Sequence, residues 1–161
     1  MSQLKNYIGS VFGGLGHLLK AYCEAEHIAV PEQLQLVQNQ ERFDYVIWRD
    51  LLEDLNRLRP KTGLGLEIAE YVQPKHLGII AYLALSCENL GEALARYHDF
   101  HRLIYDGSPL VVEFNEPYVS IRWEAPEPHP TQLTDEIAIA LMVQFLKLFM
   151  SGETIHLHEV H

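Results

Sequence analysis

The chain has 161 residues, 48% of them hydrophobic, which is enough for one sizeable core and predicts a single domain over residues 1–161. Its 22 acidic and 12 basic side chains give a net charge of −10, which argues against direct binding of nucleic acid because phosphate contacts need a basic face. No stretch is apolar over the roughly 20 residues that cross a bilayer, and no signal peptide is evident, so we expect a cytoplasmic protein with no membrane partner.

The first half of the chain predicts mostly helix. Apolar residues recur at helical spacing over residues 7–27, although four glycines weaken the beginning of this stretch. A short helix is expected to open at Pro31, and the aromatic residues 43–48 suggest a short strand. Leucines at helical spacing then predict an amphipathic helix over residues 48–58, followed by a shorter helix over residues 64–71.

Two helices joined by a tight corner are expected in the middle of the chain. Residues 77–85 carry no charge and are apolar almost all round, which predicts a helix that is buried on every side. Asn89 and Glu92 form a capping-box pattern, in which each side chain accepts a hydrogen bond from the backbone N–H of the other. A second helix therefore begins at Leu90 and ends before Asp106.

The last third predicts strands and one apolar helix. Residues 110–114 and 118–124 alternate in the manner of strands and are expected to form a hairpin whose apolar faces meet the helices. Thr134 is expected to cap a core helix over residues 135–150, and residues 154–160 suggest a final strand beside the hairpin. The predicted fold class is α+β, with several helices packed on a small antiparallel sheet made of the hairpin and the C-terminal strand.

Four short pieces follow one another in an order that resembles a known family. They are Thr-Gly-Leu-Gly-Leu-Glu at 62–67, Leu-Gly-Ile-Ile-Ala-Tyr at 77–82, Asn-Leu-Gly-Glu-Ala-Leu at 89–94 and Arg-Tyr-His at 96–98. This order is similar to the N-terminal effector domain, arabinose-binding-like, of one branch of the AraC/XylS family of bacterial transcription regulators. The resemblance extends over about residues 15–161.

The resemblance carries expectations about function and partners. It implies a domain that senses a small-molecule effector of unknown class, forms a homodimer and controls a C-terminal pair of helix-turn-helix motifs. That DNA-binding domain is expected to be absent from this chain, so DNA would be a partner only through it. Family relatives respond to amino acids, sugars and fatty acids, and the resemblance does not choose among them.

The sequence also contains candidate metal ligands and carboxylates that bear on a catalytic function. His98 and His101 have a spacing that can place two imidazoles on one metal, but no third ligand follows at a matching spacing. His156 and His158 share one face of the predicted last strand, which favours a solvent-facing surface. No serine or cysteine lies in a nucleophile motif, so no catalytic residue, metal or cofactor is predicted.

A small-molecule pocket remains as the expected functional site, because such pockets combine apolar walls with a few convergent polar groups. Aromatic and polar side chains gather in and near the central helices. Arg102 is singled out as the partner of an anionic ligand, since a guanidinium pairs with a carboxylate through two hydrogen bonds. The candidate lining residues are Trp48, Tyr82, Tyr97, His98, His101, Arg102, Tyr105 and Trp123.

Two other functions stay open at the level of sequence. The first is a ligand-less dimerisation or protein-interaction module, which predicts a collapsed interior and a large apolar surface patch. The second is a metal-dependent enzyme, which predicts loss of stability on treatment with a chelator. The sequence does not define the effector, the target promoters or the direction of regulation.

Overall fold

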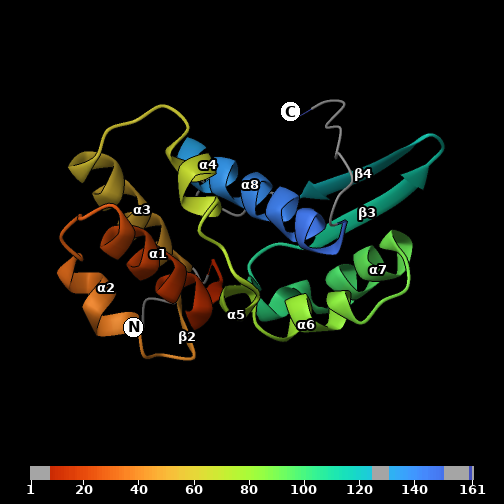
Figure 1. Cartoon of the computed structure of the whole chain (residues 1–161), viewed down its shortest axis with the longest axis horizontal. Helices are drawn as coiled ribbons and strands as arrows, with labels where there is room; N and C mark the ends of the chain where they lie inside the picture. The colour runs from red at the N-terminus through yellow and green to blue at the C-terminus, as the bar shows by residue number, and fades with distance from the viewer. Residues whose placement is uncertain (1–7, 125–130, 151–159, 161) are drawn as a thin grey trace, which may run out of the picture.

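The computed structural model describes residues 8–124, 131–150 and 160, and these form an α+β fold with two small antiparallel sheets. Two lobes lie side by side in Figure 1, with α8 running across from one to the other. The N-terminal lobe comprises β1 (Ser10–Phe12), α1 (Gly13–Ala25), α2 (Glu32–Val37), β2 (Arg42–Asp44), α3 (Tyr45–Leu58) and α4 (Leu64–Ala69). The C-terminal lobe comprises α6 (Ile79–Leu85), α7 (Leu90–Phe100), the 3-10 helix η1 (His101–Leu103), β3 (Leu110–Asn115) and β4 (Tyr118–Trp123). The linking elements are α5 (Pro74–Leu77) and α8 (Gln132–Phe149).

The predicted helix over residues 7–27 is wrong in its first part, because β1 occupies Ser10–Phe12 and α1 begins only at Gly13. β1 pairs antiparallel with β2, a strand that lies some thirty residues further along the chain. Gly9 has a φ of 113°, which ends any helix there, and a Cβ atom on Gly9 would lie 2.5 Å from the Cα atom of Gly107. The glycine therefore marks a close approach of two backbones.

A continuous apolar core fills the N-terminal lobe. On α3 the buried positions Trp48, Leu51, Leu52 and Leu55 recur at helical spacing, as the leucine pattern predicted. This helix begins three residues earlier than expected, so the predicted strand over residues 43–48 is reduced to β2. The helices α2 and α4 lie where short helices were predicted.

A polar network covers the outer end of the N-terminal lobe, where the end of α1 meets the loop after α3 and the helix α4. Arg59 forms ion pairs with Glu26 and Glu67, while the hydroxyls of Tyr71 and Tyr22 donate to Glu26 and Glu67 respectively. Hydrogen bonds from the Tyr71 hydroxyl and then the Arg59 guanidinium lower the pKa of the Glu26 carboxyl. Every charge in the network therefore has a partner.

The long helix α8 is largely apolar and packs against α4, α3 and the central helices. It begins three residues before the predicted start, because Thr131 rather than Thr134 is the N-cap and accepts a hydrogen bond from the Thr134 backbone N–H at 3.3 Å. The Glu136 carboxylate accepts from the backbone N–H of Gly65 at 3.0 Å and so caps the start of α4 from outside it. This contact ties α8 to the N-terminal lobe.

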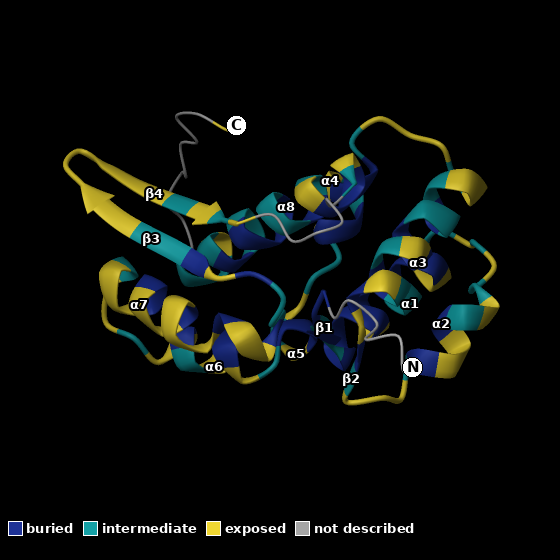
Figure 2. Ribbon diagram, turned by 180° about the vertical axis from the view of Figure 1, so that it is seen from behind, coloured by how far each residue is buried: buried dark blue, intermediate teal, exposed yellow. Residues whose placement is uncertain are grey.

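The predicted helix over residues 77–85 is divided and is not buried on every side. Gly78 adopts a φ of 67°, which separates α5 from α6. On α6 the side chains of Ile79, Tyr82 and Leu85 are exposed by 57%, 57% and 48%, and Figure 2 shows this face at the surface. An uncharged helix face therefore remains uncovered, which the apolar composition of the run did not reveal.

The corner between α6 and α7 confirms the predicted cap in its main part. The Asn89 side chain accepts from the Glu92 backbone N–H at 2.9 Å, and α7 begins at Leu90 as expected. The Glu92 carboxylate, however, accepts from the backbone N–H of Glu88 at 3.0 Å and not from that of Asn89. The second hydrogen bond of the capping box therefore comes from the backbone N–H of the residue before the N-cap and not from that of the N-cap itself.

The strands β3 and β4 form the predicted hairpin, but only its base meets the helices. Leu110, opposite Trp123, is buried, whereas Phe114, opposite Val119 at the far end of the same face, is 62% exposed. Figure 1 shows the hairpin projecting beyond the helices. Of the predicted final strand over residues 154–160, only Val160 is described, and the rest lies outside the described residues, as does the linker before α8.

Candidate functional site

The large aromatic residues of the predicted pocket mostly serve the core. Trp48 is buried in α3, and the Tyr97 ring packs on that of Phe145 from α8, with centroids 4.9 Å apart. The Tyr105 ring stacks on Tyr45 at 4.8 Å, and its hydroxyl donates to the backbone carbonyl of residue 8 at 3.1 Å. These rings therefore stabilise the packing of the two lobes.

The two histidines of α7 and η1 have separate environments. His101 is buried, and its Nδ1 and Nε2 atoms lie 2.9 Å and 3.1 Å from the backbone carbonyl oxygens of His98 and Ser108. His98 is exposed and contacts Asp99. Both ring nitrogens of His101 are thus engaged by the backbone, and the described residues contain no group of three side chains suited to hold a metal ion.

The remaining three predicted residues lie apart from one another. Tyr82 is exposed on α6, Arg102 is exposed in η1, and Trp123 is half-buried at the base of the hairpin. None of the eight predicted residues lines the cavity between α1 and α5, which is described below. Trp48 therefore lies in the core and Tyr105 packs against it, and a common pocket for the eight side chains stays a prediction.

A backbone junction connects the two lobes, and sequence reasoning missed it. The Phe12 N–H donates to the Ile104 carbonyl at 2.7 Å, and Val11 forms a bridge with Tyr105, so residues 104–106 run along β1. The Arg42 guanidinium donates to the carbonyls of Leu103, Arg102 and Ser10 and to the Ser10 hydroxyl, at 2.6 to 3.3 Å. One arginine on β2 thereby holds the end of η1 against the N-terminal lobe.

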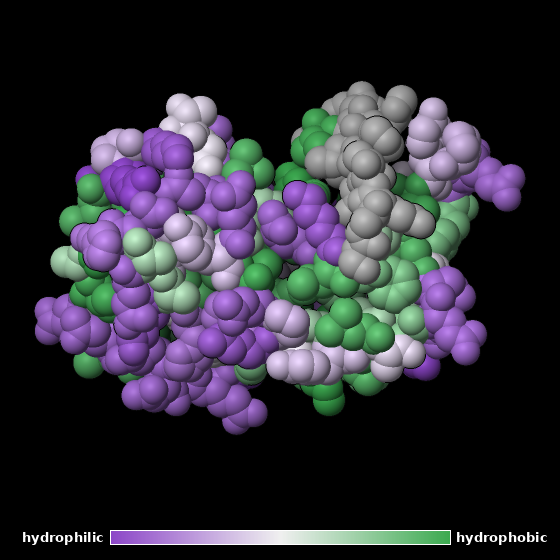
Figure 3. Space-filling model, viewed as in Figure 1, coloured by the Kyte–Doolittle hydropathy of each residue, from purple (hydrophilic) through white to green (hydrophobic). Residues whose placement is uncertain are grey.

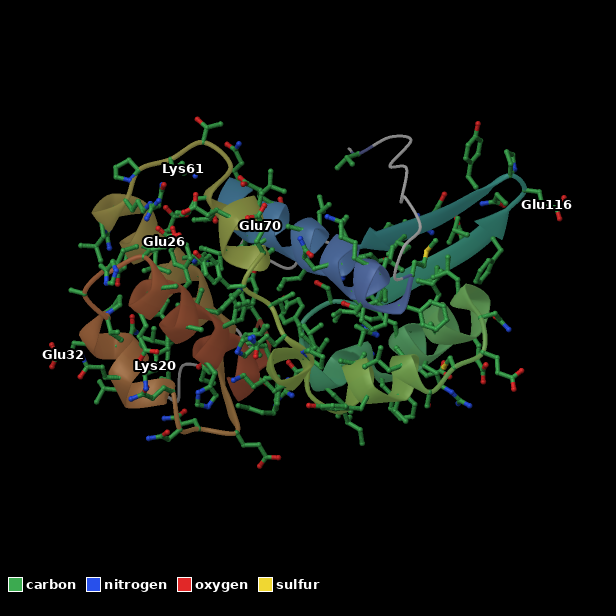
Figure 4. All side chains as sticks on the ribbon, in the orientation of Figure 1. Lys20, Glu26, Glu32, Lys61, Glu70 and Glu116 are labelled. Carbon is green, nitrogen blue, oxygen red and sulfur yellow. The ribbon has the colours of Figure 1, made fainter. Side chains whose placement is uncertain are left out.

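An open cavity of about 390 Å³ lies between α1 and α5. Four of its lining residues stand at positions i, i+3, i+4 and i+7 of α1, which is one face of a helix. Lys20, which Figure 4 labels, lies on this face, and its ammonium is 3.7 Å from the Glu24 carboxylate. The lining residues are His17, Lys20, Ala21, Glu24, Lys75 and His76.

His76 is the buried polar residue of this cavity. Its Nδ1 atom accepts a hydrogen bond from the Gln73 backbone N–H at 3.0 Å and thereby caps α5. Burial lowers the pKa of the imidazole to about 4, and the positive charge of Lys75 acts in the same direction. The ring is therefore neutral at pH 7, with its proton on Nε2 because Nδ1 is the acceptor.

A comparison with known protein families identifies the family to which the chain belongs. Residues 27–161 match the family described as the arabinose-binding domain of AraC transcription regulators, N-terminal. The chain belongs to this family. A comparison with curated proteins gives no match. The family is one of regulatory domains, as the ordered pieces between residues 62 and 98 predicted.

The match to the AraC-type domain covers the cavity only in part. It includes α5 with Lys75 and His76, whereas α1 lies before its first matched residue. The polar face of α1 was visible in the sequence as His17, Lys20 and Glu24 on one side of a predicted helix. Its facing partner was not, because α5 lies some fifty residues further along the chain and local spacing carries no information about such contacts.

None of the helices in the described part of this AraC-type domain is long and apolar enough to cross a membrane. Cys23 is buried and Cys87 is half-buried, and both are free thiols. Ser108 carries the one buried side-chain oxygen without a hydrogen-bond partner among the described residues, beside the His101 contact.

Proposed function

We propose that this chain is the ligand-sensing domain of an AraC-type transcription regulator, binding a small-molecule effector and controlling a helix-turn-helix DNA-binding domain. The observation that carries this proposal is the family match over residues 27–161. The net charge of −10 supports the view that DNA is contacted through the other domain. The proposed place of action is the cytoplasm. No catalytic role is proposed for any residue.

Effector binding acts on the equilibrium between two arrangements of the lobes. A ligand that binds one arrangement more tightly increases its population by the difference in binding free energy. The elements that link the lobes are α8, through the Glu136 contact with α4, and the Arg42 junction with η1. A change in the angle between the lobes therefore moves α8, and this movement reaches the DNA-binding domain.

Thermal unfolding of the chain in the presence of candidate effectors tests this function. The panel contains amino acids, polyamines, fatty acids and sugars, each with and without a divalent metal ion. A ligand at about 100 times its Kd adds roughly 2.7 kcal/mol of stability, which raises the Tm of a domain of this size by several degrees. A panel without any reproducible increase in Tm would contradict the sensing function.

We also propose a homodimer, in which the exposed face of α6 packs against a second copy. Ile79, Tyr82 and Leu85 provide apolar contact area, and no residue from 77 to 87 is charged, so two acidic chains can approach there without local repulsion. Figure 3 shows hydrophobic surface over this lobe and hydrophilic surface over most of the N-terminal lobe. Such a patch is typical of an interaction site.

Analytical ultracentrifugation tests the dimer. Wild type is expected to sediment as a dimer at micromolar concentration, and Tyr82→Glu as a monomer, because each copy would bury an unpaired carboxylate at the contact. Leu36→Glu, which changes an exposed leucine on α2 in the other lobe, is the control and should leave the dimer intact. Equal dissociation of the two variants would exclude α6 as the contact.

A dimerisation module without a ligand is the second candidate function. It is favoured by the same α6 face and by the packing of Trp48, Tyr97 and Tyr105 into the core rather than around a cavity. The two functions differ in one measurable respect. A dimer that forms through α6 but gains no thermal stability from any effector of the panel would favour the module.

A further inference from the structure

The cavity between α1 and α5 concentrates basic side chains in an otherwise acidic protein. Lys20 and Lys75 line it together with His17 and His76, whereas Glu24 is the one carboxylate among its lining residues. Lys20 is compensated by Glu24, since the two charged groups are 3.7 Å apart on successive turns of α1. Lys75 has no carboxylate partner among the described residues, so its charge remains available.

His76 adds a neutral donor to these charges. Only 2% of its surface is exposed, and its Nδ1 atom is occupied by the Gln73 backbone N–H. The Nε2–H group has no hydrogen-bond partner in the described part of the chain. Ser108 Oγ is the one buried side-chain nitrogen or oxygen without a partner among the described residues, so the Nε2 atom of His76 is accessible and can donate to an acceptor in the cavity.

We propose that this cavity binds a small organic carboxylate, held by the ammonium groups of Lys75 and Lys20 and by the Nε2–H group of His76. Hydrogen bonds between charged donors and a carboxylate are stronger than neutral ones. The volume of about 390 Å³ lies at the lower end of the range typical of small-molecule sites. Ala21 and the aliphatic parts of the lysines provide an apolar wall for the carbon skeleton.

This proposal deepens the sensing function and rests on it, since it names the chemical class of the effector and the place where it binds. It also differs from the pocket predicted by sequence, in which Arg102 was to hold an anion. Arg102 lies in η1, and its carbonyl accepts a hydrogen bond from Arg42, whereas Lys75 and Lys20 face one cavity from two helices. The proposed anion site lies at α1 and α5, and the role of Arg102 stays a prediction.

Isothermal titration calorimetry of the 161-residue protein at pH 7 tests the site, with acetate, succinate and citrate as probes and sodium chloride holding the ionic strength constant. Succinamide, which lacks the charge, is the ligand control. At least one carboxylate is expected to bind saturably, and Lys75→Gln should weaken its binding about tenfold because one charged donor is lost. Lys147→Gln removes an equal charge from an exposed position of α8 and should leave the affinity unchanged.

A second variant is expected to strengthen carboxylate binding rather than weaken it. Glu24→Gln frees Lys20 from its ion pair and removes the single carboxylate of the cavity, so carboxylate binding should strengthen about threefold. Its control is Glu116→Gln at the hairpin turn, which Figure 4 shows at the end of the molecule far from Lys20, and the affinity should not change there. Circular dichroism melting checks that all four variants are folded.

Four results would overturn the proposal, the last of which leaves the sensing function intact. The first is the absence of saturable binding for every carboxylate. The second is an equal effect of Lys75→Gln and Lys147→Gln, which would indicate general charge screening. The third is tighter binding of inorganic phosphate than of any carboxylate. If the effector panel instead yields a ligand whose affinity is unchanged in Lys75→Gln, the sensing function holds and the carboxylate site is wrong.

Discussion

The two lobes differ in how far their apolar side chains are buried and their charged side chains are paired. The N-terminal lobe contains most of the largest fully buried side chains of the described chain, and its outer end is covered by the network around Arg59. The C-terminal lobe leaves apolar groups exposed, among them Tyr82, Phe114 and Val119. The N-terminal lobe also exposes apolar side chains, such as Leu36 and Leu66, whereas on α6 of the C-terminal lobe Ile79, Tyr82 and Leu85 are exposed within an uncharged segment.

Truncation of a core leucine should reveal this contrast most strongly. Leu52→Ala on α3 removes a fully buried side chain and is expected to lower the unfolding free energy by about 3 kcal/mol. In the monomer, at concentrations too low for the proposed dimer, the matched variant Leu85→Ala on the exposed face of α6 should lower it by less than about 0.5 kcal/mol. Urea unfolding measures both values, and similar losses would show that α6 is also packed in solution.

The pH dependence of the unfolding free energy tests the contribution of His76, which lies in α5 between the two lobes. The pKa of His76 is lowered to about 4 from an ordinary value of 6.5, so the unfolded chain takes up a proton first as the pH falls. The contribution of His76 is therefore complete above pH 6.5 and decreases as the pH falls towards 4. The loss is on the order of 2 kcal/mol over that window.

Urea unfolding from pH 7 to pH 4.5 measures this slope, and His76→Asn should flatten it. His27→Asn removes an exposed imidazole from the N-terminal lobe and should keep the wild-type slope. His27 has a φ of 55°, which asparagine adopts readily, so the substitution in the control adds no backbone strain. An unchanged slope in His76→Asn would show that another group takes up the proton.

The cap of α7 tests how much local order the C-terminal lobe has by itself. Asn89→Ala removes the acceptor of the Glu92 N–H and should lower the unfolding free energy by about 1 kcal/mol. Asn89→Thr keeps a capping oxygen and should lose only a part of this stability. Thermal unfolding ranks the three proteins, and equal values would mean that the start of α7 is fixed by packing alone.

The hairpin should show the smallest effect at its tip. Phe114→Ser changes a side chain that is mostly exposed and should alter the unfolding free energy by less than about 0.5 kcal/mol. Leu110→Ala, at the buried end of the same face, should cost about 2 kcal/mol or more. A large loss from Phe114→Ser would indicate that the tip is covered in solution, for example by a second copy.

Local interactions explain which parts of the fold were predictable. Helical spacing identified α3, Pro31 marked the start of α2, the Asn89 cap located the start of α7, and alternation identified the hairpin. Each of these signals depends on residues only a few positions apart, which fix the backbone hydrogen bonds and the side of the element that carries apolar groups. The α+β class and the AraC-type family followed from the same stretches.

The candidate site was much less accessible to such reasoning. Aromatic residues with polar groups were expected around a pocket, but side-chain type does not distinguish a ring that lines a cavity from one that fills the core, and Tyr97 and Tyr105 pack on other rings. The cavity between α1 and α5 has a different lining, in which Lys20 and Lys75 come from segments more than fifty residues apart. The spacing of residues within either helix carries no information about which residues of the other helix lie opposite.

The sequence by itself determined the secondary structure of most elements, the acidic charge and the family. The tertiary structure decided that Ser10–Phe12 is a strand, because its partners are β2 and the backbone near Tyr105, and that α6 keeps an exposed face. It also decided which basic groups share a cavity. The physical reason is range: helix periodicity and caps act over three or four residues, whereas strand pairing, burial and cavities depend on chain segments that only the folded structure brings together.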